Sequence, residues 1–326
     1  MMELYGTFGP ACTSLPVLTE MFRAGMCGLR LNLSHRSLAQ SGDWLELARQ
    51  AAACCGVVPQ VLMDLQGPEL RVGRDGLPVE LSEGAVLPLE RLCLPAVLRE
   101  QLRPDQNLLL DDGKLQVAVT EGNCCRVLRG GTLLPGKSVA APGLTVQMPA
   151  LTTADHENLR LAPKMGVTGV MQSFVRGRED LLELRKALKD YDGENIRLFA
   201  KVENLSGLES LENWMDLADC IVIARGDLGN AVPLWQLPAV QKRVAALCRA
   251  NNKHFLVVTQ MLASMEHRAV PTRAEVSDIF NAVLDGASAL MLTGETAAGN
   301  YPAEAMDYLC KTAAEAQNFL RERKEL

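Results

Sequence analysis

Short hydrophobic runs recur along the chain, and most are followed by a segment whose hydrophobic positions repeat every three or four residues. This alternation predicts strands joined by helices in parallel β/α units. Eight runs fit a strand, at residues 4–8, 28–33, 57–64, 167–172, 196–201, 219–224, 254–260 and 287–292. Eight units in one chain predict an α/β fold of the closed (β/α)8 type, a TIM barrel.

Helix-end signals agree with this pattern. Thr272-Arg273-Ala274-Glu275 and Ser206-Gly207-Leu208-Glu209 both match the capping box, in which a hydroxyl and an acidic side chain satisfy the first free N–H groups of a helix. A helix is therefore predicted to begin at each motif. One more helix is predicted after the eighth strand, from Tyr301 to Arg323.

The regular spacing of the predicted strands along the sequence is interrupted once. Most predicted strands start 23 to 35 residues apart, but the third and fourth starts are separated by 110 residues. The intervening segment, 72–144, is rich in Gly, Pro and short apolar stretches, which predicts a small β-rich module. Because loops that follow barrel strands lie on the catalytic face, we expect a barrel of residues 1–71 and 145–326 with residues 72–144 as its lid.

The composition gives no sign of a nucleic-acid-binding, membrane-spanning or disulfide-rich protein. A formal net charge of -6 offers no basic surplus for nucleic acid, and no run reaches the roughly 18 apolar residues that a membrane span needs. The ten cysteines include adjacent pairs at Cys54-Cys55 and Cys124-Cys125 and no CxxC spacing. Adjacent cysteines are poorly placed to form disulfides, so we expect reduced thiols and a cytoplasmic protein.

Polar residues follow the predicted strands and would meet at one mouth of the barrel. Glu203 and Asp227 end neighbouring strands, which lie about 4.8 Å apart, so they could share one divalent ion. Two carboxylates that leave the remaining positions to water and substrate suit Mg²⁺ or Mn²⁺. Lys201 would stand beside that ion, where its charge could neutralise a phosphoryl group.

Other interpretations of the same residues stay open. Lys201 could form a salt bridge at the barrel mouth, or a Schiff base in a lyase, although two nearby carboxylates would keep it protonated. Asn32, Ser34 and Asp64 could hold a monovalent cation or only form hydrogen bonds at the strand ends. The glycine-rich turn at 225–229 could bind a carboxylate or phosphate through its N–H groups.

These residues lie in motifs that closely resemble the pyruvate kinase family. The matching stretches cover nearly the whole chain and are Gly9-Pro10-Ala11, Arg30-Leu31-Asn32-Leu33-Ser34-His35, Gly67-Pro68-Glu69-Leu70-Arg71, Leu110-Asp111-Asp112-Gly113, Lys201-Val202-Glu203-Asn204, Ala224-Arg225-Gly226-Asp227-Leu228-Gly229, Thr259-Gln260-Met261-Leu262-Ala263-Ser264-Met265 and Gly294-Glu295-Thr296-Ala297. The resemblance implies a glycolytic kinase that moves the phosphoryl group of phosphoenolpyruvate to ADP, giving pyruvate and ATP. It also implies a requirement for Mg²⁺ (or Mn²⁺) and K⁺.

The resemblance also implies roles for single residues. Lys201 would stabilise the transferring phosphoryl group and the enolate, Glu203 and Asp227 would bind Mg²⁺, and Thr259 would lie where enolpyruvate is protonated. The remaining implied contacts are catalytic phosphate contacts at Arg30 and Arg71, substrate contacts at Ser173, Gly226, Asp227 and Thr259, nucleotide contacts at Pro10, Arg30, His35, Asp112 and Lys137, and K⁺ ligands at Asn32, Ser34, Asp64 and the Leu65 carbonyl.

The chain also departs from the family pattern. We expect the family's C-terminal regulatory domain to be absent, and we expect a homo-oligomer, with a dimer through the barrel as one form. The substituted positions are Arg36 for glycine, Gln66 for lysine, Ala140 for asparagine, Ala231 for glutamate and Ala298 for lysine. They motivate an alternative hypothesis, a catalytically impaired paralogue that binds phosphoenolpyruvate or a partner protein.

Overall fold

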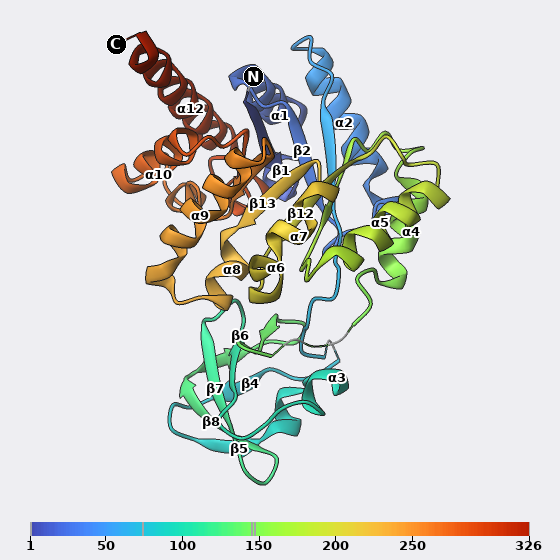
Figure 1. The fold of residues 1–326 in the computed structure, drawn as a ribbon, viewed down its shortest axis with the longest axis vertical. Coiled ribbons are helices and arrows are strands. Elements are labelled where there is room, and N and C mark those ends of the chain that lie inside the picture. Colours follow the sequence, from blue (N-terminus) through green and yellow to red (C-terminus); the bar gives the residue numbers. More distant parts are fainter. Residues whose placement is uncertain (1, 74, 145, 147, 326) are drawn as a thin grey trace.

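Eight parallel strands close into a barrel in the computed structural model, which describes residues 2–73, 75–144, 146 and 148–325 (Figure 1). Around the ring the strands are β1 (Glu3–Thr7), β2 (Gly28–Asn32), β3 (Gln60–Asp64), β11 (Gly169–Gln172), β12 (Arg197–Val202), β13 (Cys220–Ala224), β14 (His254–Val258) and β15 (Ala289–Met291). All eight predicted strands are present, and the predicted TIM barrel is confirmed.

Several strands are shorter than the hydrophobic runs that predicted them, and the backbone explains the difference in β3 and β14. Strand β3 starts only after Pro59, because proline has no N–H to donate to a neighbouring strand and the preceding Val58 side chain is 91% exposed. Strand β14 ends at Val258, because Thr259 and Gln260 have φ angles of 81° and 54°. These left-handed conformations turn the chain out of the sheet and into the barrel mouth.

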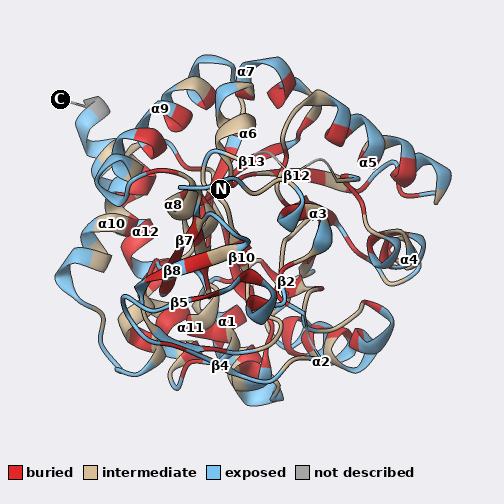
Figure 2. Cartoon of the chain, turned by 90° about the horizontal axis from the view of Figure 1, so that it is seen from below, coloured by how far each residue is buried: buried red, intermediate tan, exposed pale blue. Residues whose placement is uncertain are grey.

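Helices cover the outside of the barrel and turn their buried residues toward it, as α5 and α9 show in Figure 2. They are α1 (Leu15–Ala24), α2 (Gly42–Ala53), α4 (Thr153–Leu161), α5 (Arg178–Asp190), α6 (Leu205–Glu209), α7 (Leu211–Trp214), α8 (Arg225–Ala231), α9 (Leu237–Ala250), α10 (Arg273–Leu284), α11 (Gly294–Ala297) and α12 (Pro302–Glu325). One hydrophobic core lies between strands and helices, and a second fills the barrel interior around Phe199 and Leu256. Over the described residues, no helix is both long and apolar enough to cross a membrane.

One predicted capping box is confirmed and the other is wrong. Thr272 and Glu275 exchange both hydrogen bonds at the start of α10. Helix α6 instead begins one residue before Ser206, because the Asn204 side chain accepts the Gly207 N–H at 2.7 Å and thereby caps the helix. The Ser206 hydroxyl donates to a backbone carbonyl outside the helix.

The segment between β3 and β11 forms strands of its own at one end of the barrel (Figure 1). A five-stranded sheet, in the order β10-β6-β7-β8-β5, lies with a two-stranded sheet of β4 and β9. The elements are β4 (Val79–Leu81), β5 (Val86–Pro88), α3 (Ala96–Arg99), β6 (Asn107–Leu110), β7 (Leu115–Thr120), β8 (Cys124–Arg129), β9 (Gly131–Leu133) and β10 (Val139–Ala140). They enclose a separate core that includes Leu108, Val117 and Val127. We call this segment the lid, although its closing motion stays a prediction.

A polar cluster closes the barrel at the end opposite the predicted mouth. The Glu3 carboxylate accepts hydrogen bonds from Arg197 at 2.7 Å, Tyr5 at 3.0 Å and Gln60 at 3.1 Å. Burial raises the pKa of Glu3, but these hydrogen bonds outweigh it and hold the pKa below its usual value of 4.5. The ionised carboxylate therefore stabilises this end of the barrel.

We expect Glu3→Gln to lower the free energy of unfolding by about 1 kcal/mol at pH 7, because it removes a charge-assisted hydrogen bond to a partly exposed arginine. A lowered folded-state pKa contributes stability above pH 4.5 and loses it as the pH falls through the folded pKa. Urea unfolding of both proteins should thus show a difference at pH 7 that disappears under acid conditions. A difference that is independent of pH would contradict this role of Glu3.

Candidate active site

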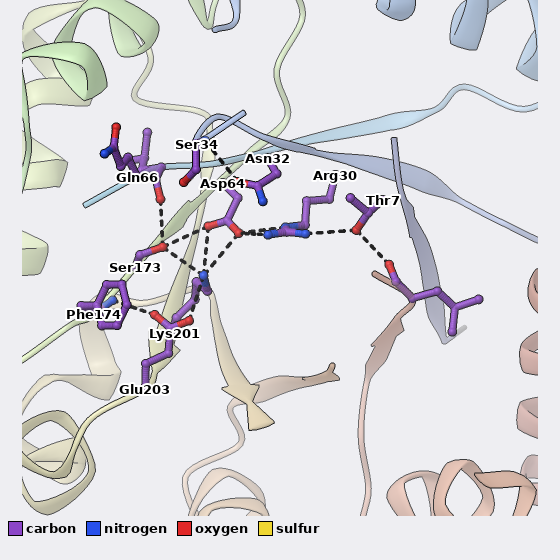
Figure 3. Close-up of polar contacts among 12 residues, drawn as sticks. Thr7, Arg30, Asn32, Ser34, Asp64, Gln66, Ser173, Phe174, Lys201 and Glu203 are labelled. Carbon is purple, nitrogen blue, oxygen red and sulfur yellow. Dashed lines mark hydrogen bonds and ion pairs between the residues drawn. The ribbon is translucent and has the colours of Figure 1, made fainter. Parts of the chain in front are cut away.

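Lys201 lies at the centre of the barrel mouth and joins three strands (Figure 3). Its ammonium lies 3.2 Å from Asp64 Oδ1 on β3, 2.9 Å from Glu203 Oε1 just after β12, and 3.0 Å from the Ser173 hydroxyl after β11. The Lys201 side chain is 11% exposed and the two carboxylates are 3% and 1% exposed. The salt bridge considered from the sequence is therefore present, and the catalytic role of Lys201 stays a prediction.

The Lys201 amine is held in its charged form. Burial acts to lower the pKa of Lys201, but the charges of Asp64 and Glu203 outweigh burial and raise the pKa above its usual value. A protonated amine can donate to an anion, whereas a Schiff base requires a neutral amine that attacks a carbonyl. The electrostatics of the mouth therefore favour anion stabilisation over lyase chemistry.

The carboxyl groups of Glu203, which is buried, and Asp227, which is half-buried, lie within hydrogen-bonding reach of each other. Burial, followed by the charges of Asp227 and Asp64, raises the pKa of Glu203 to about 7 although Lys201 acts against it. Burial also raises the pKa of Asp227, and the charges of Glu69 and Asp112 add to the effect. Three carboxyl groups of the mouth, on Asp64, Glu203 and Asp227, thus face two cations, Lys201 and Arg30.

A divalent cation would relieve this excess charge, so the donor set fits Mg²⁺ or Mn²⁺. One Glu203 oxygen accepts the Phe174 N–H at 2.8 Å, which fixes the carboxylate in place. Among the described residues, no group of three or more His, Cys, Asp and Glu could hold a metal ion. An ion at Glu203 and Asp227 would take its other ligands from water and substrate oxygens.

Three of the four residues expected near the substrate, Gly226, Asp227 and Thr259, meet where β13 runs into α8, whereas Ser173 contacts Lys201. Asp227 lies in the first turn of α8, and Gly226 lies so close to Thr259 that a Cβ there would stand 3.1 Å from the Thr259 methyl group. Arg225 donates two hydrogen bonds, of 2.8 and 3.1 Å, to the Thr259 carbonyl and pairs with Asp278 at 2.6 Å. Arg225 therefore holds the left-handed turn that presents Thr259, a role that sequence spacing could not reveal.

The four residues expected to bind K⁺ lie together, but the oxygens of three of them, Asn32, Asp64 and Leu65, have other partners. Arg30 donates twice to one Asp64 oxygen, at 2.8 and 2.5 Å, and with Lys201 it keeps the pKa of Asp64 low despite burial. Asn32 Oδ1 accepts the Ser34 N–H, and the Leu65 carbonyl accepts the Ser173 hydroxyl at 2.9 Å. Strand-end hydrogen bonding thus accounts for these contacts, and the K⁺ site stays a prediction.

Arg71 lies where the lid joins the barrel. Its guanidinium donates to Glu69 at 2.7 Å and to the Gly136 carbonyl at 2.9 Å, and its backbone forms a β-bridge with Ser138. Glu69 shares the wall of one cavity with Glu203 and Asp227, and burial together with the charge of Glu203 raises the pKa of Glu69. A phosphate contact by Arg71 remains a prediction.

Two cavities open at the mouth. The lid cavity, of about 690 Å³, lies between lid and barrel and its walls include Glu69, Asp112, Phe174, Glu203, Asp227 and Ala231. The rim cavity, of about 860 Å³, lies beside β1 and β2 and its walls include Pro10, Arg30, Asn32, His35, Trp44 and Ala298. Arg30 connects the rim cavity to Lys201, because its guanidinium bonds to the same Asp64 carboxylate.

The residues expected to contact the nucleotide are divided between these cavities. Pro10, Arg30 and His35 line the rim cavity, whereas Asp112 lines the lid cavity. Lys137 pairs with Asp111 at 2.7 Å. Sequence motifs could not reveal this division, because it depends on how the lid is seated on the barrel.

The departures from the family pattern cluster around the same cavities. Ala140 and Ala231 line the lid cavity, and Arg36 and Ala298 line the rim cavity. Gln66 follows β3, and its backbone N–H donates to Asp155 at 2.9 Å, a contact that does not involve its side chain. Four of the five substitutions therefore change the wall of a cavity and leave the Lys201 cluster untouched.

Known proteins match this chain over nearly all of its length. A family model described as pyruvate kinase, barrel domain, matches residues 2–306. Proteins named pyruvate kinase are 36% identical in Bacillus licheniformis (98% of this chain, 58% of the relative), 36% in Clostridium acetobutylicum (98% and 72%) and 39% in Corynebacterium glutamicum (91% and 65%). The chain thus spans little more than half the length of some of the curated relatives that it matches.

Proposed function

The chain belongs to the pyruvate kinase family, and from this premise we propose that it transfers the phosphoryl group of phosphoenolpyruvate to ADP, giving pyruvate and ATP with the help of Mg²⁺ and K⁺. The observation that carries the proposal is the Lys201 ammonium, which is buried and charged beside Glu203 and Asp64. Preorganised positive charge in a water-poor site is the main means by which proteins stabilise a phosphoryl group in transfer.

We assign a residue to each step of the proposed reaction. Glu203 and Asp227 would hold the divalent ion, which supplies charge neutralisation for the bound phosphate. Lys201 would donate to the bridging oxygen and stabilise the enolate that remains after the phosphoryl group leaves. Thr259, held over Gly226 by Arg225, would lie near the carbon that receives the proton.

The two cavities suit the two substrates. We infer that phosphoenolpyruvate binds at the Lys201 end of the lid cavity and the nucleotide in the rim cavity, with Arg30 between them. A lid that closes over the mouth would exclude water, which would otherwise accept the phosphoryl group in place of ADP.

A coupled assay for pyruvate tests the proposal. Pyruvate and ATP should form from phosphoenolpyruvate and ADP in the presence of Mg²⁺, and replacement of K⁺ by Na⁺ should lower the rate. The assay should be repeated with GDP, UDP and CDP, because the substitutions in the cavity walls can change which nucleoside diphosphate is preferred. Binding of phosphoenolpyruvate without pyruvate formation from any nucleotide would instead support the impaired paralogue, and borohydride capture of a keto acid on Lys201 would support the lyase.

We also infer a cytoplasmic homo-oligomer that associates through the barrel. Light scattering coupled to size-exclusion chromatography tests the oligomeric state, since a monomer at micromolar concentration would contradict it.

A further inference from the structure

The rim cavity contains an arginine whose charge no buried carboxylate neutralises. Arg30 and Arg36 are the arginines that line it among the described residues. Arg30 is bound to the buried Asp64 by two hydrogen bonds. Arg36 pairs with Asp43, whose side chain is 67% exposed, at 2.8 Å. A solvent-screened pair of this kind is worth little, so an anion in the cavity can compete for the guanidinium.

Aromatic rings hold Arg36 in place. Its guanidinium lies 4.4 Å from the centroid of the Trp44 ring, and Phe8 stacks on Trp44 with centroids 4.8 Å apart and planes 12° apart. Arg36 and Phe8 therefore both pack on the Trp44 ring, and this packing reduces the entropy that Arg36 would lose on binding a ligand.

Hydrogen bonds then orient the guanidinium. Arg36 Nε donates to the Gln40 carbonyl at 2.7 Å, and Nη2 donates to the same carbonyl and to Asp43. Nη1 has no hydrogen-bond partner in the part of the chain that the structure describes. The two Nη1 donors thus take no part in the contacts that hold the guanidinium, and Arg36 lines a cavity large enough for a nucleotide.

We propose that Arg36 binds the diphosphate of the nucleotide and is a determinant of nucleotide affinity in this chain. The inference rests on the proposed function, because it takes the rim cavity as the nucleotide site. Ala298 lines the same cavity and contributes no charge, so the cation is supplied from the loop after β2 and not from α11. In this proposal Arg36 supplies the positive charge that Ala298 lacks. The two departures from the family pattern then have one cause, a positive charge that has moved to another wall of the cavity.

The test uses Arg36→Gln, which keeps a planar polar side chain next to Trp44 but removes the charge. We expect the KM for ADP to rise about tenfold, because a charge-assisted hydrogen bond to phosphate is lost, while kcat and the KM for phosphoenolpyruvate stay near the wild-type values. Calorimetric titration of the full-length protein with ADP and Mg²⁺ should show the same loss of affinity without any turnover. Near-ultraviolet circular dichroism checks that the Trp44 stack persists.

A second variant tests the displaced charge directly. Adding Ala298→Lys to Arg36→Gln should restore most of the ADP affinity, because it returns a cation to the same cavity from another wall. Arg243→Ala is the matched control, since this exposed arginine lies on α9 outside the cavity walls. Its KM for ADP should not change.

The outcomes separate this inference from the proposed function. Pyruvate formation with an unchanged KM for ADP in Arg36→Gln would overturn the role of Arg36 and leave the proposed function standing. ADP binding that weakens in Arg36→Gln, in a protein that forms no pyruvate, would support Arg36 and overturn the proposed reaction. A wild-type protein that binds no nucleotide would overturn both.

Discussion

Lys201→Met is expected to lower pyruvate formation by about a thousandfold or more, while phosphoenolpyruvate still binds. Removal of one preorganised donor from a transition-state site typically costs a factor of 10² to 10³, and Lys201 carries a full charge in addition to its donors. The groups that this ammonium contacts, Asp64, Glu203 and Ser173, carry no positive charge of their own. The ground state keeps its other contacts, so the loss should fall mainly on kcat.

The measurement compares kcat with phosphoenolpyruvate binding by calorimetry in the presence of Mg²⁺. Lys242→Met is a suitable control, because Lys242 also forms a lysine–carboxylate pair, with Asp285 at 2.8 Å, but lies exposed on α9. A thermal melt checks folding, since Lys201→Met leaves two buried carboxylates with one cation fewer. Equal turnover by Lys201→Met and the wild type would remove Lys201 from the mechanism.

The barrel could be predicted because its signal is spread over the whole chain. Parallel strands that are buried on both faces appear in the sequence as apolar runs. Eight such runs with helical segments between them are compatible with few folds other than the barrel. The predicted boundaries of β3 and β14 were wrong because a single backbone group determines where each strand starts or ends. Pro59 shortened β3 because it lacks an N–H, and the left-handed angles of Thr259 and Gln260 ended β14 early.

The chemistry of the mouth could be predicted in outline for the same reason. Barrel closure brings the strand ends together, so the fold alone predicts that Lys201, Glu203 and Asp227 lie close to one another. Their partners could not be predicted, because the Phe174 N–H that fixes Glu203 belongs to a left-handed residue with a φ angle of 55°. No sequence pattern marks that turn, since phenylalanine rarely adopts it.

Site contacts that depend on two segments were the hardest to predict. Asp112 lies in the lid and was expected with Pro10 and His35, yet it faces the carboxylates of the lid cavity. The stack of Phe8, Trp44 and Arg36 joins the end of β1 to α2 and has no motif of its own. Both arrangements follow from packing between elements, which residue spacing along one element does not encode.

Asp227→Asn is expected to weaken Mn²⁺ binding by about 100-fold and to lower pyruvate formation at subsaturating metal by a similar factor. The amide keeps the shape of the side chain but replaces an anionic ligand by a weaker neutral one. Titration of the protein with Mn²⁺, followed by electron paramagnetic resonance of the free ion, measures the affinity directly. Asp307→Asn changes an exposed carboxylate paired with Lys311 on α12 and should bind Mn²⁺ as the wild type does.

The same substitution should stabilise the metal-free protein at alkaline pH. Burial raises the pKa of Glu203 to about 7, and the neighbouring Asp227 charge adds to the shift. A raised carboxyl pKa means that the folded state favours the protonated form, so stability is lost as the pH rises from about 4.5 to about 7. Asp227→Asn removes one of the repelling charges, and its melting temperature without metal should exceed that of the wild type at pH 8 but not at pH 5. If the variant instead melts lower at pH 8 and binds Mn²⁺ normally, the two carboxylates do not form a metal site.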